Sequence, residues 1–271
     1  MKVAIIGAGK VGRSLARALR ATSHGVELRA ARRGLPRERI AAALLVLAVR
    51  DGEVATWARQ LASSRLVTRR TAVVHVAGAL GPEVLDPLRG LSAGVAQAHP
   101  AVSFPSSSSA PSLRLASLLV AGDPVAMRRV AVVARSMGMV PRDGSAVDPV
   151  GYHVGCAIGA NGAAAIGAAA VRLIVEAGVP VDVAPAVVGE LLRSVGENIS
   201  RLGVPAALSG PVRRGDVAAL RAHLARLRGQ DPDLLPLYLE LGRVQLSMAR
   251  ELAEVPAAEL RQVQAVLRRR R

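Results

Sequence analysis

The sequence predicts an α/β fold, in which a doubly wound parallel sheet is followed by an all-helical domain. Three observations support it. Short apolar runs alternate with helical patterns in the first half of the 271 residues, a glycine-rich turn follows the first run, and no convincing strand appears from Gly151 onward. With 51% hydrophobic and 21% charged residues the chain can bury a large core, which excludes a disordered protein.

Seven apolar runs are the expected strands. They span residues 3–6, 26–30, 44–49, 71–76, 94–98, 118–121 and 139–142. Helical patterns lie between several of them, at residues 11–21, 52–63 and 124–137. This alternation is typical of a parallel sheet covered by helices.

The pattern changes after Asp148 and Pro149. Helical segments separated by Gly/Pro breaks then continue to the end of the chain. We therefore expect a nucleotide-binding domain over residues 1–147 and a helical substrate and dimerisation domain over residues 148–271. The Ala/Gly-rich helix at residues 152–175 is apolar on all sides, so we expect it to be buried against the sheet domain, a second subunit, or both.

The strongly basic composition does not predict a nucleic-acid partner. The net charge is +16, but all except two of the 36 basic residues are arginines distributed along the chain. A nucleic-acid module concentrates its charge on one face and, for single strands, offers aromatic stacking platforms. Only four aromatic residues are present, so we expect no specific nucleic-acid binding.

Cysteine content and hydropathy predict a cytoplasmic protein without a membrane span. The single cysteine, Cys156, excludes an internal disulfide and a Cys-rich metal site, and we predict no metal. The apolar run at the N-terminus is short and broken by glycines, unlike a signal peptide. The uncharged stretch Val154–Val171 is long enough to span a bilayer, but its alanines, glycines and Asn161 make transfer into lipid unfavourable.

The motif GAGKVG follows the first strand and opens the first helix. In this position Gly7 permits a tight turn, Gly9 lets the backbone approach a diphosphate, and Gly12 allows the helix to pack closely on the strand. The diphosphate would lie at the helix N-terminus, with Lys10 and Val11 among its neighbours. The alternative is a glycine-rich turn that binds no ligand.

The end of the second strand favours NADP over NAD. An NAD enzyme places an acidic residue there to bind the ribose 2′-hydroxyl, whereas this chain reads ELRAARRG. The guanidinium groups of Arg32 and Arg33 can pair with a 2′-phosphate. The alternative is that they are two ordinary residues of an arginine-rich protein.

Three histidines are candidates for proton transfer, because the second domain has no lysine. His75 and His99 lie toward the ends of two expected strands, and His153 begins the long helix. Positions 153, 157 and 161 follow an i, i+4, i+8 progression, which places His153 and Asn161 along one side of that helix. Each histidine alone could instead be a core or capping residue, and Cys156 is better interpreted as a packing residue.

Two further segments leave alternatives open. In LSGPVRRGD, Asp216 is placed to cap a helix that begins at Val217, while Arg213 and Arg214 could either clamp a substrate carboxylate or simply form the turn. The serine-rich segment 106–112 is a loop, more plausibly a linker than a lid.

Taken in order, these segments resemble a known family. GAGKVG, VLAVRDGEV, VVHVAGALG, AHPAVSF, YHVGCAIGAN and ALSGPVRRGD are similar to a Rossmann-like family provisionally described as NADP oxidoreductases, whose C-terminal half is a domain of unknown function. This family is related to 6-phosphogluconate dehydrogenase and pyrroline-carboxylate reductase. The resemblance implies a Rossmann domain, a helical domain that dimerises, and a substrate cleft between them. It also implies cofactor contacts at Val49, Arg50 and Gly78.

The wider superfamily also suggests catalytic residues. Its members use a lysine and an asparagine one turn apart on the first long helix of the second domain. Asn161 matches that asparagine, but Ala157 stands where the lysine would be. The resemblance therefore moves the acid role to His153 or His99.

These observations predict a cytoplasmic, homodimeric, NADPH-dependent oxidoreductase. It would transfer a hydride to a small oxo or imino acid, with ketopantoate as one example of such a substrate. Two alternatives are an enzyme that exchanges hydride between NADP and a deazaflavin coenzyme, and a non-catalytic NADP-binding sensor.

Overall fold

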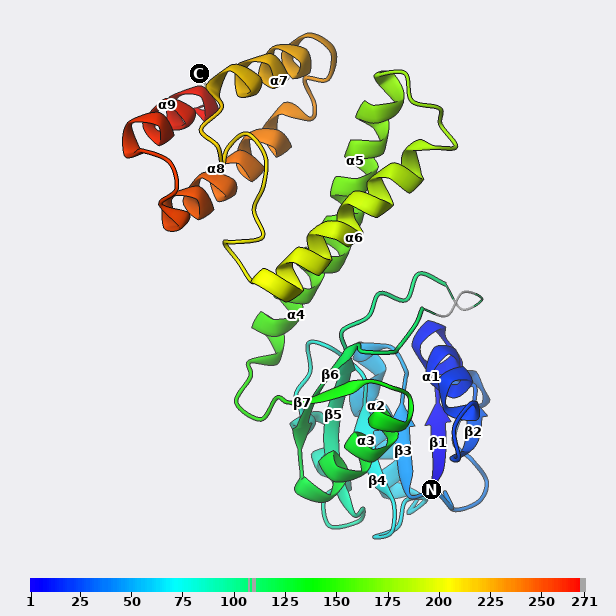
Figure 1. Ribbon diagram of the computed structural model, residues 1–271. Helices are drawn as coiled ribbons and strands as arrows, with labels where there is room; N and C mark the ends of the chain where they lie inside the picture. The colour runs from blue at the N-terminus through cyan, green and yellow to red at the C-terminus, as the bar shows by residue number, and fades with distance from the viewer. Residues whose placement is uncertain (107, 109–110, 269–271) are drawn as a thin grey trace. The chain divides into compact units, whose positions relative to one another are not determined.

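The computed structural model describes residues 1–106, 108 and 111–268 (Figure 1). The chain divides into two compact units, Met1–Gly162 and Ala163–Arg271. This division falls later than the boundary expected between residues 147 and 148, because the first helical turns of the second half group with the sheet. Residues 107, 109 and 110 of the serine-rich loop lie outside the described part, so the choice between linker and lid stays open.

One seven-stranded sheet forms the centre of the first unit, in the order β2-β1-β3-β4-β5-β6-β7. The strands are β1 (Lys2–Ile6), β2 (Gly25–Arg29), β3 (Leu44–Leu47), β4 (Ala72–His75), β5 (Gly94–Pro100), β6 (Ser117–Gly122) and β7 (Val140–Asp143). The neighbouring pairs are parallel except β5 and β6, which are antiparallel. The expected parallel pairing is corrected at this pair, and the described residues between β5 and β6 include no helix that would carry the chain back for a parallel strand.

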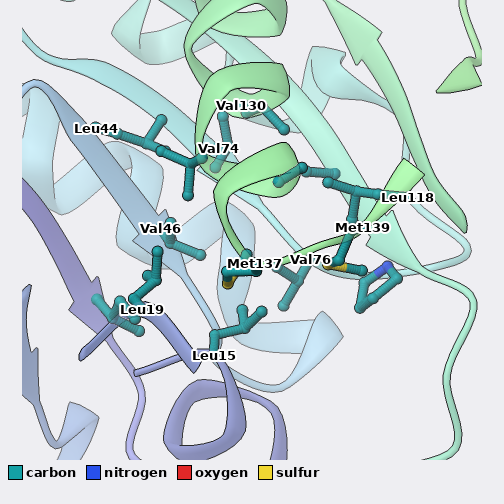
Figure 2. Close-up of a pocket in the computed structure, with 15 residues that line it drawn as sticks. Leu15, Leu19, Leu44, Val46, Val74, Val76, Leu118, Val130, Met137 and Met139 are labelled. Carbon is teal, nitrogen blue, oxygen red and sulfur yellow. The ribbon is translucent and has the colours of Figure 1, made fainter. Parts of the chain in front are cut away.

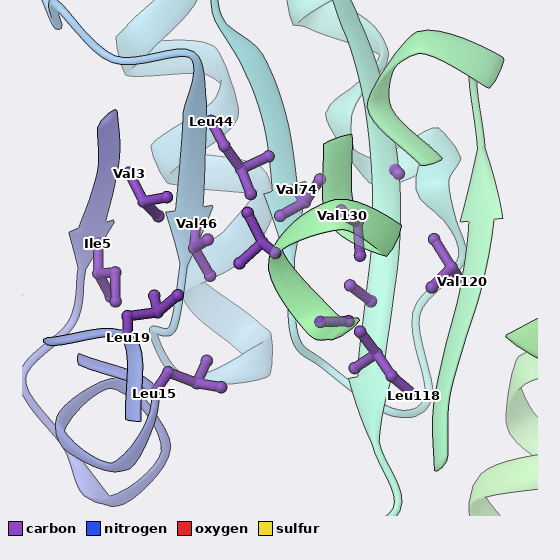
Figure 3. Close-up of a cluster of buried hydrophobic side chains, with 14 of the residues drawn as sticks. Val3, Ile5, Leu15, Leu19, Leu44, Val46, Val74, Leu118, Val120 and Val130 are labelled. Carbon is purple, nitrogen blue, oxygen red and sulfur yellow. The ribbon is translucent and has the colours of Figure 1, made fainter. Parts of the chain in front are cut away.

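Helices cover both faces of this sheet, as a doubly wound fold requires. Helices α1 (Lys10–Arg20) and α3 (Pro124–Ser136) pack on one face (Figure 3), and α2 (Asp51–Ser63) with the 3₁₀ segment η2 (Pro82–Leu88) packs on the other. Along β1, Val3 and Ile5 belong to the first core, while Ala4 and Ile6 belong to the second. Burial on both faces explains why the central strands β1, β3 and β4 are largely continuous apolar runs rather than alternating ones.

The core beneath α1 and α3 contains a small cavity of about 40 Å³ (Figure 2). Its lining is entirely apolar and includes Leu15, Val46, Val74, Val130 and Met137. A cavity of this kind stays dry, because a water molecule inside would have no polar partners. We therefore interpret it as a packing defect rather than a ligand site.

Helices alone form the rest of the described chain, residues 149–268. They are α4 (Pro149–Ala157), the π-helical turn η3 (Ile158–Gly162), α5 (Ala163–Glu176), α6 (Ala184–Leu202), α7 (Val217–Gln230), α8 (Leu235–Leu252) and α9 (Ala257–Leu267). In the second unit, α7, α8 and α9 share a core built around Leu220, Leu224, Leu246, Leu260 and Val263. Helices α5 and α6 pack against each other, with Val188 and Leu192 beside Gly167.

The Ala/Gly-rich segment is largely exposed in the single chain, so its expected burial against a second subunit stays a prediction. Helix α4 has no buried residue, and only Gly167 of α5 is buried. The continuous stretch Pro149–Glu176 is long and apolar enough to cross a membrane by length and composition alone. In the part of the chain that the structure describes, this segment therefore presents a large apolar surface.

Candidate functional site

The turn between β1 and α1 has the geometry that the glycine motif predicts. Gly7 adopts a φ of +115°, and a Cβ there would lie 2.2 Å from the Ala48 carbonyl oxygen. A Cβ on Gly12 would lie 1.8 Å from the Gly7 carbonyl oxygen and 3.3 Å from the Ala48 Cβ. These two glycines are therefore required by the turn and by close packing of helix and strand.

Gly9 differs from Gly7 and Gly12, because the space beside it is open. Apart from its own chain neighbours, no heavy atom of the described residues lies within 4 Å of a Cβ built on Gly9. Gly9 is also the N-cap of α1, where no side chain caps the helix and no acidic residue occupies the first turn. The free N–H groups and the helix dipole make this end of α1 suited to an anion.

A groove of about 430 Å³ extends from this turn across the ends of the neighbouring strands. It is lined by Gly7, Ala8, Gly9, Arg13, Ala30, Ala31, Arg32, Ala48, Val49, Arg50, Glu53 and Trp57. Of the predicted cofactor residues, the groove brings together Gly7, Gly9, Arg32, Val49 and Arg50.

The other predicted cofactor residues lie outside this lining. Lys10 is exposed at the start of α1, Val11 packs against the core, and Gly12 is buried beneath the turn. Arg33 is exposed beside the groove, while Gly78 is buried next to two histidine rings.

Apart from alanines, the groove contains three residues that the sequence did not predict, Arg13, Glu53 and Trp57. Arg13 donates from Nε to the Ala8 carbonyl at 2.7 Å, which places its guanidinium beside the glycine turn. Glu53 accepts from Arg50 Nη2 at 2.6 Å, and Trp57 closes the groove from α2. A signal for Arg13 was its place in the first helical turn, one residue after the motif.

The short segment that carries Arg32 is held by a neighbouring arginine. Residues Ala31–Arg33 form a 3₁₀ turn, η1. The guanidinium of Arg29 donates to the carbonyls of Arg33, Gly34 and Leu35 at 3.0 to 3.1 Å. The hydrogen-bonding capacity of the Arg29 guanidinium is therefore used by the loop carbonyls. Arg32 is the arginine of this segment that lines the groove.

A second cavity, also of about 430 Å³, brings the predicted catalytic residues together. His99 lies near the end of β5, His153 on α4, and Asn161 in the π-helical turn. The cavity is lined by these residues and by Pro100, Ala101, Val102, Ser103, Phe104, Cys156, Ala157, Gly159 and Ala160. The wider π turn interrupts the regular i, i+4, i+8 progression, yet both His153 and Asn161 line the cavity.

The two imidazoles of this cavity face each other edge to face. Their centroids are 5.7 Å apart, and Tyr152 packs edge-on against His99 at 5.6 Å. The Nδ1 atoms of His99 and His153 are buried and have no hydrogen-bond partner among the described residues. Burial, and next the charge of His153, lower the pKa of His99, while Asp51 opposes the shift. A lowered pKa makes the protonated ring a stronger acid but favours the neutral ring near pH 7, so donation by His99 requires that the ring first take up a proton.

Two groups near these histidines, His75 and Tyr152, are better explained by structural roles than by proton transfer. His75 is fully buried and donates from Nε2 to the Gly81 carbonyl at 3.1 Å, and burial lowers its pKa. It lies outside the lining of the histidine cavity. Burial and a hydrogen bond with Cys156 raise the pKa of Tyr152 to about 12, so this phenol stays protonated.

The turn before α7 is structural. Asp216 caps the helix by accepting from the Ala219 N–H at 3.0 Å, as predicted. Arg213 makes a bidentate pair with Glu254 at 2.8 Å and also donates to the Ala206 and Leu208 carbonyls. Because these contacts occupy its guanidinium, the turn interpretation holds for Arg213 rather than the carboxylate clamp. Among the described residues, no group of three His, Cys, Asp or Glu side chains could hold a metal ion.

Comparisons with solved structures show the same fold in other proteins. A Bacteroides fragilis protein provisionally described as an NADP oxidoreductase superposes with a TM-score of 0.69 at 18% identity, covering 90% of this chain and 97% of that one. A Thermotoga maritima protein gives 0.65 at 20% identity, covering 92% and 98%. Pyrroline carboxylate reductase from Plasmodium falciparum, with NADP bound, gives 0.58 at 12% identity, covering 99% and 100%.

Family models match both halves of the chain, whereas a search of curated proteins finds no match. Residues 1–100 match the Rossmann-like domain. Residues 116–245 match the domain of unknown function DUF2520. The chain therefore consists of a Rossmann-like domain followed by a C-terminal domain of the DUF2520 family, the combination that its ordered motifs predicted.

Proposed function

We propose that this protein is an NADPH-dependent reductase that transfers a hydride to the C=O or C=N group of a small oxo or imino acid. The observation that carries the proposal is the open cradle at Gly9. It combines unobstructed space, uncapped helical N–H groups and, in the same groove, the guanidinium of Arg32. These features suit the diphosphate and the 2′-phosphate of NADP.

The second part of the proposal concerns proton transfer. Bound NADPH would supply the hydride, and the product oxygen or nitrogen then needs a proton. His99 or His153 would donate it, while the Asn161 amide would orient the substrate. Both imidazoles line one cavity with that amide, near the end of β5 in the same unit as the cradle.

Several solved structures with this fold add support for the chemistry. Relatives include proteins described as NADP oxidoreductases and pyrroline carboxylate reductases, and the Plasmodium falciparum structure contains NADP. A pyrroline carboxylate is a cyclic imino acid, which favours C=N reduction as strongly as C=O reduction.

The cofactor proposal is tested by nucleotide titration of Arg32→Ala, with Arg33→Ala as the matched control. A lost charge-assisted contact of about 1.5–3 kcal/mol corresponds to roughly a 10- to 100-fold weaker binding of NADPH. We expect this loss for Arg32→Ala with little change for NADH, and a smaller loss for Arg33→Ala. Equal losses of both nucleotides would contradict the assignment of the 2′-phosphate.

The competing proposal is a non-catalytic NADP sensor, which the alanine at position 157 favours. The two are separated by supplying NADPH with a panel of oxo acids and cyclic imines and following absorbance. Turnover on any member supports the reductase, while tight binding without turnover on the whole panel supports the sensor.

A further inference from the structure

Gln97 is a buried polar residue that the sequence reasoning did not identify. It lies on β5, two residues before His99, and pairs in register with His75 of β4. Its Nε2 donates to the carbonyls of Ala77 at 3.0 Å and Gly78 at 3.2 Å. One side-chain amide thus ties the turn that follows β4 to the neighbouring strand.

The turn that Gln97 holds is in direct contact with both cavity histidines. A Cβ on Gly78 would lie 2.2 Å from His153 Nδ1 and 2.9 Å from His99 Nε2. The two rings come from different elements, β5 and α4, so the glycine backbone is the surface that both share. Any movement of this turn therefore alters the space available to each ring.

We propose that Gln97 is a positioning residue, which fixes the Ala77 and Gly78 carbonyls and thereby holds the glycine backbone that sets the spacing of His99 and His153. The role in catalysis rests on the proposed function, in which one of these imidazoles donates a proton. The positional role does not require it. Only a side-chain amide or a similar double donor can satisfy two adjacent carbonyls, because a hydroxyl has a single hydrogen to give.

Removal of the Gln97 amide should change the surroundings of His99 and His153. Without a donor, the two buried carbonyls would have to find other partners, and the turn would shift toward water. His99 would then gain solvent and separate from His153. Since burial and the charge of His153 are what lower the pKa of His99, this pKa should rise toward the ordinary value of 6.5.

The test is an NMR titration of the imidazoles in Gln97→Met, without nucleotide. Methionine keeps a similar size but has no donor, and the His99 resonance is identified from its loss in His99→Gln. Thr71→Val is the matched control, because Thr71 is also buried and donates its hydroxyl hydrogen to a backbone carbonyl, that of Ala42 at 2.7 Å, just before β4. We expect a raised His99 titration in Gln97→Met and a wild-type titration in Thr71→Val.

Gly78→Ala provides an independent test in case Gln97→Met does not fold. The added methyl group must displace the imidazole rings, so the titration of His99 should change. A wild-type His99 titration in either variant would overturn the inference. NADPH binding to the wild-type protein is measured separately by calorimetry, so failure of the proposed function leaves the histidine result readable.

Discussion

The motif contains three glycines, Gly7, Gly9 and Gly12, and a different physical reason explains each of them. Gly7 is required by its positive φ, and Gly12 by the approach of its helix to the Gly7 carbonyl. Gly9 is different, because its φ of −79° suits any residue and no atom stands beside it. The fold itself does not need a glycine there, so the open space is better explained by a ligand that approaches the backbone.

Alanine substitutions should therefore separate binding from folding. Gly9→Ala should leave the free energy of unfolding within about 0.5 kcal/mol of wild type, as is usual for exposed sites, yet weaken NADPH binding on the order of tenfold or more. Gly12→Ala should destabilise the fold by more than about 1 kcal/mol, because the methyl group would collide with backbone. Urea unfolding and nucleotide titration measure both quantities. A Gly9→Ala variant that binds NADPH normally would contradict the ligand-based explanation.

At the residue scale, the sequence provided candidate residues but not the contacts that place them. The motif made its glycines candidates for cofactor binding, and the need for a proton donor made His99 and His153 candidates. The sequence could not show that Arg32 lines the groove while Arg33 does not. Both arginines belong to the 3₁₀ turn Ala31–Arg33, and the contacts of Arg29 with the loop carbonyls hold this turn in place. Nor could the sequence identify Gln97, whose partners lie about twenty residues away in the chain.

The central strands of the sheet were predictable because each is buried on both faces, whereas the edge strands β2 and β7 contain no buried residue. Continuous apolar runs such as Leu44–Leu47 have no other stable placement, and the observed bounds differ from the expected ones by only a few residues. The antiparallel β6 and the π-helical turn Ile158–Gly162 were not predictable. Strand direction depends on the path of a long connection, and a π turn leaves no distinct apolar period.

The two faces of β4 differ in how well they are packed, and this difference can be measured. Val74 lines the 40 Å³ cavity (Figure 2). Its neighbour Val73 is fully buried on the opposite face, outside that lining. Val74→Ile should stabilise the protein by up to about 0.8 kcal/mol, the value of one buried methylene. Val73→Ile should cost about 1–3 kcal/mol through overpacking. Equal changes in the urea midpoint of the two variants would show that the cavity cannot admit the extra group.

At the scale of the whole molecule, each compact unit has its own core, but the second leaves a long apolar stripe uncovered. On α6, residues Val187, Leu191, Val195 and Ile199 recur every four positions with exposed fractions between 36 and 57%. On the same face, the first residues of the helix are buried at Ala184 and Val188, so the exposed stripe covers the remainder of that face. Soluble monomers rarely expose a contiguous apolar surface of this kind, so the stripe is typical of an interface.

We propose that a second copy of the chain covers this stripe, as the expected homodimer requires. In a two-fold dimer each substitution acts twice, so Val195→Glu should remove about 1.5–3 kcal/mol of apolar burial from each side and add a desolvated charge. Light scattering should then change from twice the chain mass of 28.0 kDa in the wild type to a single chain mass in the variant. Val244→Glu, at an exposed valine of α8 outside the stripe, should remain dimeric. A wild-type protein that stays monomeric at high micromolar concentration, or a Val195→Glu variant that still dimerises, would contradict this assignment, because the stripe would then have no role in association.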